Sequence, residues 1–258
     1  MQISYVIKFV LLLYASQFVI APLVLYFTNK QSANPEFTTF DLVDPPLLLP
    51  TSYTQSLSLL ESLGFQPVAH LYGEALATNV RTVLTLYVNR MEREMATVVL
   101  MLSEVPPTTR ILHTYTEFCT EFDDGHELSS SNSPHPGLFT EVPEKQIFRL
   151  PHLTNPQHLY EVHRALTGQR LGANKRVPLP GQEVNELIAG MKMDIAREAA
   201  FGRFSLDASG EWYRPTMRGA IYSTFMLIWP IGMLRRRLQR RRGVRLATEV
   251  FRNRPLYR

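Results

Sequence analysis

The chain contains almost no cysteine. Its 258 residues include one thiol, Cys119, so no disulfide can form within the chain. This excludes the class of small secreted proteins that disulfides hold together. It does not exclude an extracytoplasmic domain, because a domain of about 180 residues buries enough apolar surface without such bonds.

The chain also lacks the short motifs of common enzymes. Its glycines are scattered, and neither GxGxxG nor GxxxxGK[ST] occurs, so no phosphate-binding loop is recognisable. HExxH, GxSxG and CxxC are absent as well. We therefore predict no catalytic residue, no cofactor and no metal ligand, and we favour a non-catalytic function.

One weak candidate for a metal site is a group of acidic and imidazole side chains around a predicted hairpin. The group comprises Glu117, Glu121, Asp123, Asp124, His126 and Glu127. Oxygen ligands this close together can hold a divalent cation. These acids alternate along strands instead of following a wrapped loop, however, so a solvated outer face explains them without a metal.

Histidine and cysteine give two further weak candidates. His152, His158 and His163 fall within twelve positions, but the last two are five residues apart on a predicted helix and point to different faces. Cys119 shares a strand face with His113, yet six residues along a strand span about 20 Å. A structural role is the simpler interpretation of both groups.

Charge is strongly segregated along the chain. Residues 1–30 carry two lysines and no acid, a net +2. Residues 31–216 carry 14 basic and 22 acidic side chains, a net −8, whereas residues 217–258 carry 11 arginines and one glutamate, a net +10. An acidic body with a strongly basic C-terminal segment is more informative than the total of +4.

Two apolar segments predict membrane helices. Residues 9–27 contain no charge and span about 28 Å as a helix, close to the thickness of the hydrocarbon core. The run is longer than the apolar core of most signal peptides, which favours an uncleaved anchor over a cleaved one. Residues 219–234 form a shorter candidate, and Pro230 either kinks it or indicates a segment that lies at the interface.

The arginines after this second segment predict its orientation. Basic residues close to a membrane helix stay in the cytoplasm, so both termini are predicted inside and residues 31–216 outside. Anionic lipid headgroups are the predicted partners of this cluster, with a cytoplasmic protein as an alternative. Nucleic acid is disfavoured, because no aromatic side chains are interleaved for stacking. The predicted lipid-contacting residues are Arg235, Arg236, Arg237, Arg240, Arg241, Arg242 and Arg245.

The pattern between the two segments predicts an α+β fold. We expect an antiparallel meander of four to five strands packed with about three helices, flanked by N- and C-terminal transmembrane helices. Hairpins are predicted at residues 89–93 and 123–125, and a helix is predicted to begin at Asn155-Pro156. The predicted segments are 1–8 (cytoplasmic), 9–27 (helix), 28–50 (Pro-rich linker), 51–216 (domain), 217–234 (helix) and 235–258 (Arg-rich tail).

These features together predict a two-pass protein of the cell membrane. Its outer domain would be a non-catalytic binding or scaffold domain for a protein partner in the envelope or membrane. Two alternatives remain: a ligand-binding domain or hydrolase-type enzyme whose site forms only in three dimensions, and an accessory subunit of a membrane complex.

Overall fold

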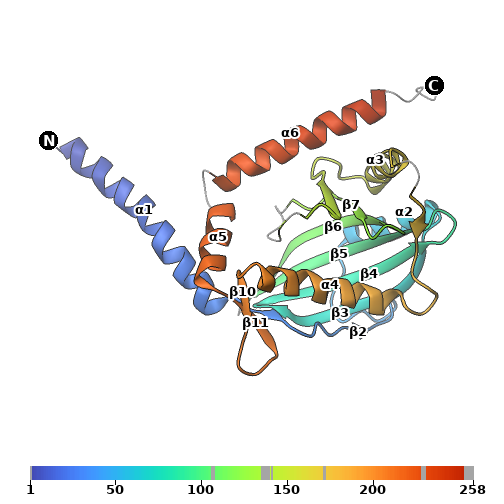
Figure 1. The fold of residues 1–258 in the computed structure, drawn as a ribbon, viewed down its shortest axis with the longest axis horizontal. Coiled ribbons are helices and arrows are strands. Elements are labelled where there is room, and N and C mark those ends of the chain that lie inside the picture. Colours follow the sequence, from blue (N-terminus) through green and yellow to red (C-terminus); the bar gives the residue numbers. More distant parts are fainter. Residues whose placement is uncertain are drawn as a thin grey trace.

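The computed structural model describes residues 2–105, 108–134, 140, 142–170, 173–227 and 231–252. Within these residues the chain forms six helices and one eleven-stranded sheet (Figure 1). The helices are α1 (Gln2–Thr28), α2 (Thr51–Ser62), α3 (Pro156–Gly168), α4 (Glu183–Ala200), α5 (Met217–Leu227) and α6 (Ile231–Arg252).

The sheet is mixed and lies at the centre of the molecule. Its main path runs β10-β11-β1-β3-β4-β5-β6-β7-β8; β2 pairs with β3, and β9 pairs with β6. The pairing is antiparallel except between β7 and β8. The strands are β1 (Gln31–Ser32), β2 (Thr38–Thr39), β3 (Gln66–Ala77), β4 (Val80–Asn89), β5 (Glu94–Val105), β6 (Thr108–Phe122), β7 (Glu127–Ser131), β8 (Lys145–Arg149), β9 (Lys175–Arg176), β10 (Phe204–Leu206) and β11 (Trp212–Pro215).

The predicted meander of four to five strands is therefore wrong as a description of the sheet. The prediction missed the parallel edge strand β8 and the short strands β1, β2 and β9. Residues 28–50, predicted as a linker, contribute two of these, because Gln31 pairs with Tyr213 and Thr38 pairs with Tyr72. Two-residue strands carry no periodicity that a sequence pattern reveals.

The predicted hairpins are confirmed. Asn89 pairs with Glu94 across the turn between β4 and β5. Thr120 faces Leu128 across the second turn, where Phe122 N–H donates to the carbonyl of His126 at 2.8 Å. Gly125 has a φ of +80°, a conformation that favours glycine.

Both faces of the sheet are covered, so the fold has three layers. On one face α2, α3 and α6 pack on a core that includes Tyr53, Phe118 and Leu159. On the other face α4 crosses the sheet, and its Val184 and Leu187 pack beside Val99 (Figure 1). Strand β5 is covered on both faces, because its residues contribute to both cores.

Local sequence explains where the helices begin and end. The Asn155 side chain accepts a hydrogen bond from Gln157 N–H at 2.8 Å, and Pro156 occupies the first turn, as predicted. Thr51, a residue type that often caps helices, does not cap α2: Pro50 precedes the helix, and no side chain caps it. Gly64 (φ +85°) follows the end of this helix.

Among the described residues, no helix is both long and apolar enough for a membrane crossing. The predicted two-pass topology, multi-pass localisation and membrane-anchored function are therefore wrong. The predicted span 219–234 is not one apolar helix, because α5 ends at Leu227 after 11 residues and α6 carries the arginines. Eleven residues of helix span only about 16 Å. Pro230, where a kink was predicted, lies outside the described residues.

The two segments that were predicted to span the membrane nevertheless lie side by side. Helix α5 runs along α1, and the rings of Phe18 and Phe225 lie 5.4 Å apart between their centroids (Figure 1). Helix α6 extends back over the body of the molecule toward α3 (Figure 1). This return places the arginine-rich segment against the sheet.

Candidate anion-binding site

Helix α6 contacts the edge strand β8 through small residues. Gly243 and Ala247 are buried on the face of α6 that meets the body. A Cβ atom added to Gly243 would lie 2.8 Å from Leu150 Cδ2 and 3.3 Å from the carbonyl oxygen of Arg149. The close approach of the helix to the strand therefore requires glycine at this position.

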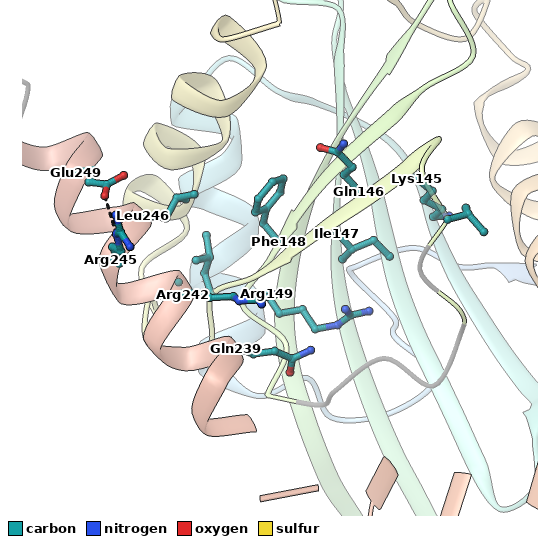
Figure 2. A pocket seen from close by; sticks show the side chains of 13 residues that line it. Lys145, Gln146, Ile147, Phe148, Arg149, Gln239, Arg242, Arg245, Leu246 and Glu249 are labelled. Carbon is teal, nitrogen blue, oxygen red and sulfur yellow. Dashed lines mark hydrogen bonds and ion pairs between the residues drawn. The ribbon is translucent and has the colours of Figure 1, made fainter. Parts of the chain in front are cut away.

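A pocket of about 510 Å³ lies between β8 and α6, and we call it the β8–α6 pocket (Figure 2). Strand β8 is at the sheet edge, so side chains from both of its faces reach the pocket. The lining residues are Val142, Lys145, Gln146, Ile147, Phe148, Arg149, Leu150, Gln239, Arg242, Gly243, Arg245, Leu246 and Glu249. Its described lining thus combines apolar walls with four cationic side chains and one carboxylate, a net +3.

Lys145, the cation at one end of the pocket, forms ion pairs with two carboxylates. Lys145 Nζ lies 2.8 Å from Asp194 Oδ2 on α4 and 3.2 Å from Glu127 Oε2 on β7. Burial disfavours the charged amine, but the two carboxylates outweigh it and raise the pKa of Lys145. Lys145 is therefore charged, and its charge is compensated within the protein.

The guanidinium groups on α6 are less compensated. Arg245 Nε lies 3.0 Å from Glu249 Oε1, a pair that is largely exposed to solvent. Arg242 is exposed, and no carboxylate of the described residues lies within ion-pair distance of it. Figure 2 shows Arg242 extending from α6 toward the strand that carries Arg149. A guanidinium in this setting is a donor for a phosphate or carboxylate.

The structure places the seven predicted lipid-contacting arginines on one helix but not on one face. Arg242 and Arg245 line the β8–α6 pocket. Arg237, Arg240 and Arg241, which we call the outer arginines, gather around a separate shallow hollow that Arg245 also borders. Arg236 is exposed, and Arg235 is half-buried.

The acidic group predicted as a solvated outer face lies partly beneath α4. Glu127 contacts Lys145, and Glu121 lies 3.6 Å from Arg176, which also pairs with Glu186 of α4. Burial, and then the Glu127 charge, raise the pKa of Glu117. Among the described residues no three His, Cys, Asp or Glu side chains gather as a metal site requires.

The three clustered histidines lie in different surroundings. His163 is buried in the core, where Nε2 lies 2.9 Å from Thr120 Oγ1 and Nδ1 lies 3.1 Å from Ser130 Oγ. Burial, and then the Lys175 charge, lower the pKa of His163 to about 3. His158 contacts the ring of Phe251 on α6. The structure therefore gives His163 a structural position in the core.

Cys119 lies on the sheet face that α4 covers. Its strand partner on β7 is Ser129, and its partner on β5 is Met95. Burial raises the pKa of the Cys119 thiol well above its ordinary value, which favours the unreactive protonated form.

A second hollow of about 710 Å³ runs between α2 and β6. Ser52, Gln55, Thr114 and Asn132 contribute hydroxyl and amide groups to its walls, and His113 and Tyr115 are the titratable residues among its described lining. The β8–α6 pocket carries more charge, so it is the stronger candidate site.

No protein family, curated protein or solved structure matches this chain. The site is therefore interpreted from its own geometry. The arginines of α6 are evident in the sequence, whereas the part that Lys145, Phe148 and Arg149 of β8 play is not. The run KQIFRL, 145–150, does not alternate between polar and apolar residues, so its pattern gives little indication of a strand.

Proposed function

We propose that the chain binds anionic lipid headgroups at a membrane surface through α6. The observation that carries this proposal is a helix with eight arginines and one glutamate, a net +7, whose outer arginines are exposed and lie together. Each basic residue near an anionic surface contributes about 1 kcal/mol. The proposal concerns contact with a surface and involves no crossing.

Exposed apolar side chains on the same helix support a lipid surface as the partner. Ile231, Leu234 and Leu238 are 42%, 58% and 47% exposed, and their spacing of three and four residues places them on one stripe. The stripe continues toward Arg241 and Arg245. A helix that combines apolar and basic surface in this way lies in the plane of a lipid interface.

The alternative partner of an arginine-rich helix is nucleic acid, and α6 is less suited to it. Sequence-tolerant binding of single strands uses aromatic platforms on which bases stack. Phe251, the aromatic residue of α6, packs against His158 of α3 and not beside the outer arginines. Charge and apolar surface together favour lipid.

The test is flotation of the purified full-length chain with vesicles. We expect more protein to float with vesicles that contain anionic lipid than with vesicles of zwitterionic lipid alone. Replacement of Arg237, Arg240 and Arg241 by Gln is expected to lower the affinity for anionic vesicles by at least about tenfold, since it removes three charges.

The matched control removes three exposed cations elsewhere, by Arg110→Gln, Arg164→Gln and Lys192→Gln, and leaves α6 unchanged. This control has the same net charge as the α6 variant, so a general charge effect would weaken both variants equally. Equal loss in both variants, or equal flotation with the two lipid compositions, would contradict the proposal. Preferential binding of single-stranded nucleic acid would do so as well.

A further inference from the structure

Arginine side chains of α6 line the β8–α6 pocket, an arrangement that a flat lipid-binding surface does not need. Arg242 follows Arg241 directly, and successive residues on a helix point about 100° apart. Arg241 belongs to the outer arginines, whereas Arg242 lines the pocket. One helix therefore presents cations in two directions, outward and toward the open pocket beside β8.

The walls of this pocket are apolar below the cations. Ile147, Phe148 and Leu150 come from β8 and the residue that follows it, and Leu246 comes from α6 (Figure 2). The volume of about 510 Å³ lies within the range of small-molecule sites, about 300–1,000 Å³. A bare inorganic anion would contact the guanidinium groups but leave the apolar walls in contact with water.

We propose that the β8–α6 pocket binds one phosphate-headed amphiphile, whose phosphate contacts Arg242 and Arg245 and whose apolar part lies against Phe148 and Leu246. Guanidinium groups bind phosphate through paired hydrogen bonds, and two of them match a dianionic phosphate better than a monoanionic carboxylate. The proposal names the ligand of this pocket and is independent of whether the outer arginines contact a bilayer.

Glu249 limits the affinity of the pocket in the free protein. Its carboxylate pairs with Arg245 at the rim, and it is the one acidic side chain among the described residues that line the pocket. A bound phosphate must compete with this carboxylate for the guanidinium. Removal of the carboxylate therefore strengthens the binding of an anion, an effect that damage to the fold would not produce.

The experiment is calorimetric titration of the full-length chain with four probes: octyl phosphate, octanoate, octanol and inorganic phosphate. The amphiphilic probes are used below the concentrations at which they aggregate. Octyl phosphate is expected to bind most tightly. Arg242→Gln is expected to weaken this binding about tenfold, as expected for the loss of a charge-assisted contact. Arg252→Gln is the matched control, because it removes the same charge from the same helix at an exposed position outside the pocket and the outer arginines. It is expected to leave the affinity within about twofold.

Glu249→Gln is expected to strengthen the binding of octyl phosphate several-fold. The proposal is overturned if octanoate or octanol binds as tightly as octyl phosphate, or if inorganic phosphate does. It is also overturned if Arg252→Gln and Arg242→Gln weaken binding equally. Flotation with vesicles depends on the outer arginines and this titration depends on Arg242, so failure of one experiment is distinguishable from failure of the other.

Discussion

At the scale of single residues, two buried polar side chains near α3 have specific partners. His163 bridges hydroxyl groups on two strands, Thr120 on β6 and Ser130 on β7. Glu94, which is fully buried, pairs with Lys175 on β9. A buried charge without its partner is strongly destabilising, so these contacts tie α3 and β9 to the sheet.

The burial of His163 predicts a pH dependence of stability. In the unfolded chain a histidine binds a proton below about pH 6.5, whereas folded His163 stays neutral until about pH 3. Stability from this residue is therefore fully present above the unfolded pKa and is lost as the pH falls toward the folded pKa. The free energy of unfolding is expected to fall by about 2 kcal/mol between about pH 6.5 and about pH 5 for this reason.

This dependence is measured by urea unfolding of the wild type and of His163→Gln near neutral pH and near pH 5. The His163→Gln variant is expected to be less stable than the wild type at both pH values, because glutamine packs less well at this position. Glutamine cannot bind the proton, however, so the stability of the variant lacks this pH dependence. The free-energy difference between the two proteins is expected to shrink by about 2 kcal/mol at the lower pH. A difference that stays constant with pH would show that His163 does not carry the effect.

At the scale of elements, the docking of α6 on β8 depends on Gly243, which has no side chain. Gly243→Ala is expected to destabilise the protein by about 1–3 kcal/mol and to speed amide exchange in α6, because the added methyl group would overlap Leu150. Gly190→Ala on α4 is the matched control. A Cβ at Gly190 meets no atom within 4 Å, so this change is expected to stabilise by about 0.5–1 kcal/mol.

Unfolding curves and hydrogen exchange measure both glycine variants. Stabilisation by Gly243→Ala, or faster exchange of α6 in Gly190→Ala alone, would show that α6 does not rest on β8 at this position. The comparison separates helix propensity from packing, since alanine favours a helix in both variants.

The elements that sequence predicts well are those with local signals. Asn155-Pro156 and Gly168 delimit α3, and the turn at Gly125 fixes the pairing of Thr120 with Leu128. Strand β8 could not be paired from sequence, because its parallel partner β7 is separated from it by residues 132–144. Parallel pairing lacks the tight turn that reveals an antiparallel hairpin.

Only part of the candidate site could be predicted from the sequence, because the rest depends on contacts between distant segments. Arginines at 235–245 are obvious in the sequence, but their division between an outer group and a pocket depends on which face of α6 meets β8. That orientation is set by Gly243 and Ala247, two small residues whose burial the charge pattern conceals. The apolar walls at Ile147 and Phe148 become part of the site only through this contact.

At the scale of the whole molecule, the charge segregation seen in the sequence becomes spatial. The acidic middle of the chain forms the sheet and its covering helices, and α6 carries the basic charge across one side of this body (Figure 1). A strongly basic helix on an acidic body would orient the molecule toward an anionic surface, as the proposed function requires. Such orientation depends on ionic strength, because salt screens exposed charges over about 10 Å at 0.1 M.

The measurement that tests the central proposal most directly is the affinity of the full-length chain for anionic vesicles as a function of salt. Contact through the outer arginines predicts that the affinity falls steeply between about 50 and about 200 mM salt. It also predicts that the variant lacking Arg237, Arg240 and Arg241 shows a much smaller decrease. An affinity that does not change with salt, or an equal decrease in both proteins, would contradict the account.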